Sequence, residues 1–196
     1  MAQSKTTERA ADQAPANGKA EGKPQRKRIT RRQAVEQKLR SYFEAIDNRD
    51  AAAALSHWRE DGVDDVVPVG MLRGRDEIGA FYRSIFAAMP DARTTVTRLI
   101  AGEQSCAVEW RTEGTFDGAT YMGIEPTGGH VEIRGVDLFE IEDGEFVSNT
   151  GYFDGAGFAR QIGMLPADGS GADRAMKSAF NGVTKLRRAM AERKRA

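Results

Sequence analysis

The chain has 196 residues, which suffices for one domain with a substantial core and leaves little room for two full ones. The formal net charge is zero, yet residues 1–30 carry 7 Lys and Arg against 3 Asp and Glu, and residues 170–196 carry 8 against 2. Residues 31–169 carry 14 against 24. We therefore expect an acidic body with basic ends, which either bind an anionic partner or fold back onto the body.

The composition also excludes several classes of protein. A single cysteine, Cys106, excludes an internal disulfide and suits a reducing compartment. Only His57 and His130 accompany it, so the usual sets of Cys and His ligands cannot be assembled into a metal site. No apolar run is long enough for a secretory signal or a membrane-spanning segment. The composition thus predicts a cytoplasmic protein with no metal and no integral membrane segment.

The first predicted elements are a tail and a helix. Residues 1–30 are polar, contain Pro and Gly and lack aromatic side chains, so we expect a disordered basic tail. Thr30 is a suitable N-cap, and the apolar residues after it recur at helical spacing. These residues are Val35, Leu39, Tyr42, Phe43 and Ile46. They predict a first amphipathic helix.

Two further helices and a short strand follow. Asp50 can cap a second helix through "AAAALSHWRE", with Leu55 and Trp58 on its buried side. The acidic "DGVDDVVPV" is typical of a turn and a short strand that stops at Pro68. "GRDEIGAFYRSIFAAMPD" predicts a third helix that Pro90 ends. The apolar face of this helix consists of Ile78, Phe81, Ile85 and Met89.

From Ala92 onward the hydrophobic period changes to two. "TTVTRLIAG", "SCAVEWRTEGTF", "HVEIRGVDLFEIEDG" and "EFVSNTGYFD" each alternate or nearly so, and Asp-Gly in "EDGE" favours a tight hairpin turn. Helices followed by a meander of long strands indicate an α+β fold, with the N-terminal helices packed on a curved antiparallel sheet. The natural pocket lies between these two layers.

After Pro166, "ADGSG" indicates a hinge, and a basic amphipathic helix is predicted beyond it. The apolar side of this helix consists of Met176, Phe180, Val183, Leu186 and Met190. It could dock on a partner subunit, on an anionic membrane surface or on its own domain. The expected division is therefore a tail at 1–30, an α+β domain at 31–166, and a hinge with a helix at 167–196.

Two acidic residues stand out in the strand pattern. Counting by twos along "HVEIRGVDLFEIED", Asp137 falls on the more apolar face unless a bulge at Gly135 shifts the phase. In the next strand, Asp154 falls on the same face as Phe146 and Tyr152. A carboxyl among aromatic side chains is desolvated, which raises its pKa and suits it to carry a proton near neutral pH. Two such acids on adjacent strands could divide the roles of acid and base.

The two acids also have structural interpretations. Asp154 directly precedes "GAGFARQIG", where an acidic residue is well placed as a helix N-cap. Asp137 could instead form an ion pair with Arg111 or Arg134.

Trp110 and His57 are further candidates. Trp110 shares a face with apolar residues of its strand, so we expect it in the core or in the wall of the pocket. His57 stands beside Trp58 on the predicted second helix and could reach the pocket or remain at the surface.

Three segments carry a resemblance to a known family. They are "MPDARTTVTRLIAG", "GIEPTGGHVEIRGVDLFEIEDGEFV" and "YFDGAGFARQIGMLP". With the order of helices and strands over roughly residues 33–166, they resemble the SnoaL-like polyketide cyclases and ester cyclases of the nuclear transport factor 2 superfamily. The resemblance implies a cone-shaped α+β domain with an apolar pocket for a small hydrophobic ligand. It also implies a homodimer formed through the outer face of the sheet.

The resemblance further implies a reaction. The cyclases of this family close a ring in a polyketide ester by an intramolecular aldol reaction, with no metal or cofactor. An acidic residue at the end of the last strand serves as general acid/base, and Asp154 falls on that position. From the strand pattern, we expect Asp137 to be its partner or to orient it. The expected substrate-binding residues are Tyr152, Asn149, His57, Trp58 and Trp110. Many relatives have His and Trp where this chain has Asn149 and Thr150, so an altered pocket is expected.

The leading hypothesis is therefore a cofactor-free cyclase or isomerase of a small hydrophobic carbonyl compound. A related alternative is an epoxide hydrolase, in which paired acids and an Arg activate water, as in other members of the superfamily. An alternative of a different class is a non-catalytic ligand-binding or assembly module that docks on an anionic partner through its basic ends.

Overall fold

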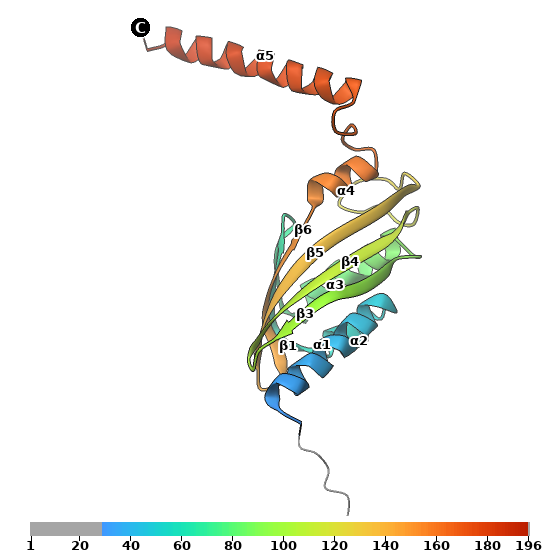
Figure 1. Ribbon diagram of the computed structural model, residues 1–196. Helices are drawn as coiled ribbons and strands as arrows, with labels where there is room; N and C mark the ends of the chain where they lie inside the picture. The colour runs from blue at the N-terminus through green and yellow to red at the C-terminus, as the bar shows by residue number, and fades with distance from the viewer. Residues whose placement is uncertain (1–28, 196) are drawn as a thin grey trace, which may run out of the picture.

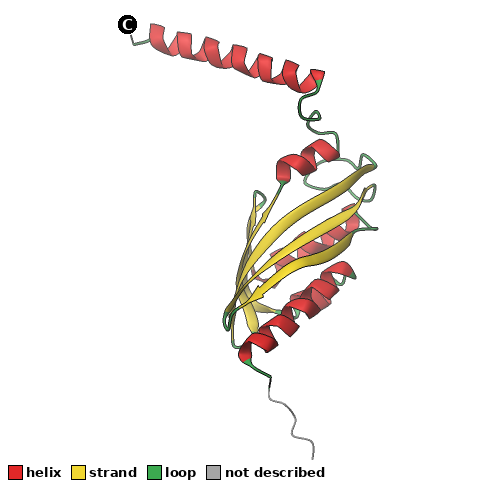
Figure 2. Ribbon diagram, viewed as in Figure 1, coloured by secondary structure: helices red, strands yellow, loops and turns green. Residues whose placement is uncertain are grey.

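In the computed structural model, which describes residues 29–195, helices cover one face of a curved sheet (Figures 1 and 2). The strand order in the sheet is β2-β1-β6-β5-β4-β3. The strands are β1 (Trp58–Val67), β2 (Gly70–Arg73), β3 (Arg93–Ala101), β4 (Ser105–Phe116), β5 (Gly129–Glu142) and β6 (Glu145–Phe153). This is the predicted α+β arrangement. The basic tail expected at 1–30 lies outside the described residues except for its last two.

The helices are α1 (Arg31–Asp47), α2 (Ala51–Leu55), α3 (Gly74–Ala88), α4 (Gly155–Gln161) and α5 (Gly171–Arg193). Thr30 caps α1, as predicted. The Gln33 amide donates to Thr30 Oγ1 at 3.2 Å, and the Thr30 amide donates to Gln33 Oε1 at 2.8 Å, which completes a capping box. The apolar sides of α1 and α3 pack toward the sheet, so the cavity forms between these helices and the strands.

The second helix is shorter than predicted, because Trp58 belongs to a strand. α2 ends at Leu55, and Trp58 begins β1 opposite Phe146 of β6. The Trp58 ring is fully buried, with centroids 6.0 Å from Phe139 and 5.6 Å from Phe146. This aromatic packing outweighs the helix propensity of the preceding alanine run. The short strand expected before Pro68 is correspondingly a strand of 10 residues.

One pair of strands makes the sheet mixed instead of purely antiparallel. β1 lies parallel to β6, with Asp64 opposite Asn149. β3, β4, β5 and β6 form the predicted antiparallel meander. Asp143 and Gly144 turn the β5–β6 hairpin with φ of 47° and 83°, the conformation that Asp-Gly favours. The meander follows from local signals, whereas the parallel pair joins segments far apart in the sequence.

A register shift in β6 changes the face that Phe146 occupies. The pairing between β5 and β6 shifts at this point, and Val147 is the extra residue. Phe146 is consequently fully buried, while Tyr152 lies on the outer face and is 51% exposed. The prediction that Phe146 shares a face with Tyr152 and Asp154 is therefore wrong.

The main core is an aromatic cluster between α1 and the sheet. Phe139 and Phe146 stack with their ring centroids 4.5 Å apart. Tyr42 of α1 meets these rings edge-on, at 5.5 Å and 5.1 Å respectively. A second cluster around Phe116 and Ile162 lies where α4 covers the sheet. These contacts fix the position of Tyr42 relative to the strands.

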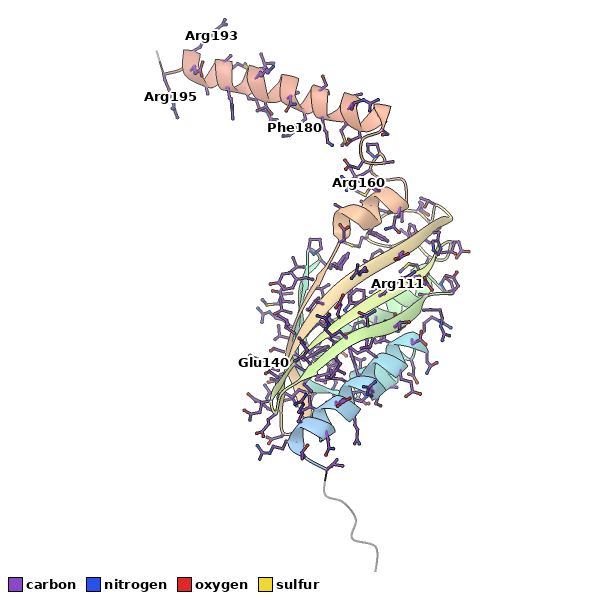
Figure 3. The ribbon with its side chains drawn as sticks, viewed as in Figure 1. Arg111, Glu140, Arg160, Phe180, Arg193 and Arg195 are labelled. Atoms are coloured by element: carbon purple, nitrogen blue, oxygen red, sulfur yellow. The ribbon has the colours of Figure 1, made fainter. Side chains whose placement is uncertain are left out.

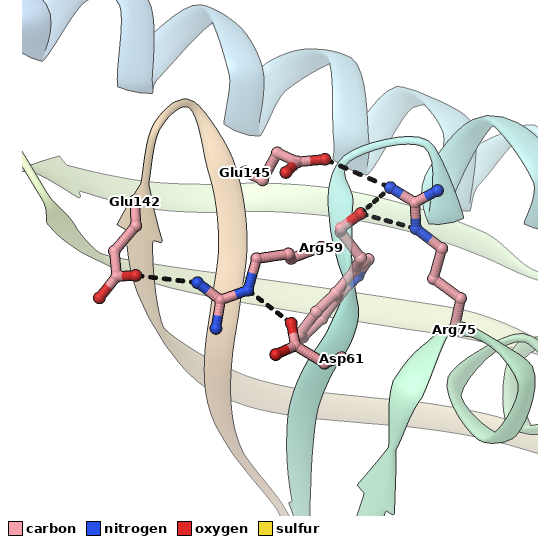
Figure 4. Close-up of polar contacts among 6 residues, drawn as sticks. Arg59, Asp61, Arg75, Glu142 and Glu145 are labelled. Carbon is pink, nitrogen blue, oxygen red and sulfur yellow. Dashed lines mark hydrogen bonds and ion pairs between the residues drawn. The ribbon is translucent and has the colours of Figure 1, made fainter.

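Arginine side chains tie β1 to its neighbours beside the β5–β6 hairpin (Figure 4). Arg75 of α3 donates from Nε to the carbonyl oxygen of Trp58 at 2.7 Å and pairs with Glu145 at 3.3 Å. Arg59 pairs with Glu142 at 2.9 Å. Exposed ion pairs each contribute about 0–1 kcal/mol, so the bond to the Trp58 carbonyl is the more important contact. It satisfies a backbone acceptor where the β1–β6 ladder is irregular.

Replacing Phe146 by Ala should lower the free energy of unfolding by about 3–5 kcal/mol, because it removes a ring from the centre of the aromatic cluster. Urea denaturation followed by circular dichroism measures the change. Leu138→Ala removes an apolar side chain from the exposed outer face of β5 and should cost about 1 kcal/mol or less. Equal losses in the two variants would contradict the assignment of Phe146 to the core.

Candidate functional site

A cavity of about 490 Å³ lies between the helices and the sheet. Most of its lining is apolar and includes Phe43, Phe81, Ile85, Phe116, Ile133 and Phe158. Carboxyl and amide groups enter the lining from three adjacent strands, as Asp64 of β1, Asn149 of β6 and Asp137 of β5. A cavity of this size and lining suits a small hydrophobic molecule. The polar side chains mark the part of the cavity where chemistry is possible.

Asp64 lies in β1 opposite Asn149 and is 2% exposed. Asn149 Nδ2 donates to Asp64 Oδ1 at 2.9 Å, and the Tyr82 hydroxyl donates to Asp64 Oδ2 at 3.3 Å. Burial raises the pKa of Asp64 to about 6, although the two hydrogen bonds favour the ionised form and hold the pKa down. At neutral pH, Asp64 is therefore mostly a carboxylate, and it accepts hydrogen bonds from Asn149 and Tyr82.

Asp137 lies in the middle of β5. The β4–β5 register is regular through Gly135, so Asp137 faces the helices, as the alternation predicts. Gly151 of β6 lies opposite, and a Cβ there would come within 2.7 Å of Asp137 Oδ1. A Cβ at Gly135 would come within 2.3 Å of Trp110 Cζ2. These two glycines therefore make room for the Asp137 carboxyl and for the Trp110 indole.

The environment of Asp137 favours its protonated form. The side chain is part of the cavity lining, and burial followed by the negative charge of Asp64 raises the pKa of Asp137 to about 7. The Asn149 amide and the Trp110 indole oppose this rise only in part. Of two neighbouring carboxyls, the second to ionise does so at the higher pH. Asp137 thus keeps its proton in a pH range where Asp64 has lost its own.

A pair of tyrosines connects Asp64 to the helices. The hydroxyls of Tyr42 in α1 and Tyr82 in α3 share a short hydrogen bond, and Tyr82 also donates to Asp64. Burial raises the pKa of both phenols well above their usual range, so both remain protonated. The result is a chain of hydrogen bonds from Tyr42 through Tyr82 and Asp64 to Asn149. This chain fixes the Asp64 carboxylate before any ligand binds.

Asp154, the predicted general acid/base, is exposed and is the N-cap of α4. Its Oδ1 accepts from the Gly157 amide at 2.7 Å, and its carbonyl oxygen accepts from the Phe158 amide at 3.0 Å. A Cβ at Gly157 would come within 2.3 Å of Asp154 Oδ2, so the glycine leaves room for the cap. Asp154 borders a shallow depression on the outer face of the sheet, beside Tyr152. The structure therefore does not bring Asp154 together with Asp137 in the cavity.

The predicted substrate-binding residues divide between three places. Asn149 and Trp110 line the cavity. Tyr152 lies on the outer face, and Trp58 is buried in the aromatic cluster without lining the cavity. His57 stacks on Phe146 with centroids 6.1 Å apart, outside the cavity lining. Burial, and then the charge of Lys38, lowers the pKa of His57 and favours the neutral ring.

The sequence prediction overlooks Asp64, Tyr42 and Tyr82 as members of the site. Alternation along "DGVDDVVP" does place Asp64 on one face with Gly62 and Val66, but Asp65 lies on the other face between two valines. The pattern therefore cannot decide which aspartate points inward. Within residues 29–195, no three His, Cys, Asp or Glu side chains are arranged to hold a metal ion.

The fold is shared with several solved structures. A protein from Jannaschia sp. CCS1 classed as a SnoaL-like polyketide cyclase has a TM-score of 0.64 and 17% identity, covering 71% of this chain and 99% of that chain. AclR from Streptomyces galilaeus, classed as a hydroxylase, has a TM-score of 0.62 and 20% identity, covering 81% of this chain and 94% of that chain. IdmH from Streptomyces antibioticus, classed as a polyketide cyclase, has a TM-score of 0.58 and 20% identity, covering 66% of this chain and 98% of that chain. At such identities the likeness shows the fold alone.

The sequence itself shows the family. No curated protein matches the chain. The family model of the SnoaL-like polyketide cyclases matches residues 36–162, which include Asp64, Asp137 and Asn149. The match runs from α1 to α4 and leaves α5 outside. The chain therefore belongs to the SnoaL-like polyketide cyclase family.

Proposed function

We propose that this chain is a cofactor-free enzyme that removes a proton alpha to a carbonyl group of a small hydrophobic substrate and closes a ring by an aldol reaction. The observation that carries the proposal is the pair of carboxyls, Asp64 and Asp137, that enters an otherwise apolar cavity. Burial holds the pKa values of both near neutrality, where a carboxyl can accept or donate a proton. Membership of the cyclase family supports the same class of reaction.

The two carboxyls take different roles because their environments differ. Asp64, ionised and hydrogen bonded by Asn149 and Tyr82, is the general base that takes the proton from carbon. The resulting enolate carbon attacks a second carbonyl carbon of the same substrate and forms the new bond. Asp137, still protonated, gives its proton to the alkoxide oxygen that this step creates. Transfer of a proton from Asp64 to Asp137 then restores the starting state.

The cavity supports this chemistry in two ways. Its apolar walls exclude water, which strengthens the interaction of hydrogen-bond donors with a developing oxyanion. The Trp110 indole Nε1 is buried beside Asp137 and makes no hydrogen bond of standard geometry within the described chain. An indole N–H can only donate, so it is suited to an enolate or alkoxide oxygen. We therefore assign Trp110 to oxyanion stabilisation together with Asp137.

The alternatives receive less support from the cavity. Epoxide hydrolysis by paired acids would need an arginine to assist, and the cavity lining in the described part of the chain contains no Arg or Lys.

A homodimer through the outer face of the sheet stays a prediction, for which Val136, Leu138 and Tyr152 offer exposed apolar surface.

Substitution of each aspartate by asparagine separates their roles. Asp64→Asn and Asp137→Asn should each reduce turnover of a cyclisable polyketide ester by about 10²–10⁴-fold, because each removes one proton-transfer group. Asp154→Asn is the matched control, since asparagine is as good an N-cap as aspartate and the residue lies outside the cavity. If Asp154→Asn lost as much turnover as the other two variants, the assignment of catalysis to Asp64 and Asp137 would be refuted. Asp154 at the end of β6 would then be favoured as the general acid/base.

The pH dependence of turnover should be a narrow bell. The value of kcat/KM should rise as Asp64 ionises at a pKa of about 6 and fall as Asp137 loses its proton at a pKa of about 7. Steady-state kinetics between acidic and alkaline pH measures both limbs. A constant rate across this range would contradict the division of roles.

Stability provides a test that needs no substrate. The folded pKa values of Asp64 and Asp137 lie above the ordinary value of 3.8, so the folded protein binds more protons than the unfolded chain between these values. The free energy of unfolding should therefore fall as the pH rises from about 4 to about 7. Asp137→Asn should remove part of this fall and gain on the order of 2 kcal/mol relative to wild type at alkaline pH. Urea denaturation of both proteins at several pH values measures the difference, and parallel pH curves would contradict the burial of the charge.

A further inference from the structure

α5 projects away from the rest of the molecule, to which a loop joins it (Figures 1 and 3). The Asp173 amide donates to Ser170 Oγ at 3.1 Å. The Asp173 carboxylate is buried and accepts from the Gly169 amide at 3.0 Å and from Lys177 Nζ at 2.7 Å. These contacts hold the start of α5 against the residues that directly precede it. Beyond them, its side chains are exposed almost throughout.

The exposed length of α5 carries a continuous apolar stripe. The stripe consists of Met176, Phe180, Val183, Leu186 and Met190, which recur at helical spacing. Phe180 is 70% exposed, and Figure 3 shows it far from the sheet. A helix in a protein gains most of its stability by packing its apolar face against another surface, so we expect this stripe to have a partner.

The charge of α5 indicates the chemistry of that partner. Its C-terminal half and the two residues after it carry basic side chains, namely Lys185, Arg187, Arg188, Arg193, Lys194 and Arg195. Glu192 is the only acidic residue among residues 174–196. Two copies of α5 packed in parallel would bring their basic C-terminal halves side by side, which disfavours this pairing with a second copy. Charge complementarity favours an anionic surface.

The combination of stripe and charge favours lipid over nucleic acid. Phosphate backbones attract Lys and Arg but offer no apolar phase in which Phe180 and Leu186 could be buried. A bilayer interface offers both anionic headgroups and acyl chains, and it binds helices with an apolar face opposite a basic one. In residues 29–195 no helix is long and apolar enough to cross a membrane, so α5 would lie along the surface.

Part of the cavity lining reaches the surface near α4. Met122 and Met164 line the cavity and are 61% and 62% exposed. Met164 follows α4, and α4 lies between the sheet and α5 in Figure 1. These exposed methionines extend the apolar surface of the α5 end of the molecule.

We propose that α5 binds the surface of anionic membranes, with its apolar stripe in the acyl-chain boundary and its basic side chains on the headgroups. This inference does not depend on the proposed catalytic function. It concerns the helix that the match to the cyclase family leaves outside.

Sedimentation of the full chain with lipid vesicles tests the proposal. Binding to phosphatidylglycerol-containing vesicles should exceed binding to pure phosphatidylcholine vesicles and should weaken as salt is added. Phe180→Glu should weaken binding about tenfold or more, because it removes an apolar anchor. Ser178→Glu is the matched control: it adds the same charge two residues away, on the opposite side of the helix, and should weaken binding much less.

Three results would overturn the proposal. The first is equal binding to both kinds of vesicle. The second is equal loss of binding in Phe180→Glu and Ser178→Glu, which would leave the stripe without a role. The third is a chain that does not bind either kind of vesicle and sediments as a dimer, with Phe180→Glu converting the dimer to a monomer. This result would assign the stripe to a second copy.

Discussion

The parallel ladder between β1 and β6 is the interaction on which the site depends. It brings a strand from the helical N-terminal part of the chain beside the last strand of the meander, and it sets Asp64 against Asn149. The antiparallel ladder on the other side of β6 sets Gly151 against Asp137. β6 therefore holds the two carboxyls in one lining, while the register shift at Val147 lets Phe146 enter the core and Asn149 still point inward. A one-residue slip of β6 would turn Asn149 outward and separate the carboxyls from their shared neighbour.

Much of this arrangement could be predicted from local patterns. The helical period of α1 and α3, the alternation of β3 to β6 and the Asp-Gly turn gave the fold class and the face of Asp137. Asp64 could not be found in this way, because both faces of β1 carry an aspartate and valine, and the choice between them depends on pairing with a distant strand. Trp58 was assigned to a helix for the same reason. Its place is decided by Phe139 and Phe146, which lie more than eighty residues further along the chain.

Asp154 illustrates how one sequence position can fit two roles that the geometry separates. An acid at the end of the last strand matches the family pattern for a catalytic group and also the preference for a helix cap. A carboxylate that accepts from the Gly157 amide and lies outside the cavity cannot also reach the α-carbon of an enclosed substrate. We therefore assign the proposed acid–base chemistry to carboxyls deeper in the fold, on β1 and β5. Their cost is electrostatic, because the Asp64 carboxylate is buried in the wall of an apolar cavity, and the hydrogen bonds from Asn149 and Tyr82 offset part of this cost.

Gly135 and Gly151 have a consequence for how the pocket can change during evolution or in the laboratory. Neither position can accept a side chain without displacing Trp110 or Asp137, so these two positions on the sheet side of the cavity are closed to variation. On the helix side, Tyr42 and Tyr82 are restricted because they hold Asp64, but Phe81, Ile85 and Phe86 of α3 contribute only apolar bulk to the wall. Volume-conserving exchanges among apolar residues are well tolerated in packed proteins. Apolar exchanges in α3 can therefore reshape the cavity, while the strands keep Asp64, Asn149 and Asp137 in place.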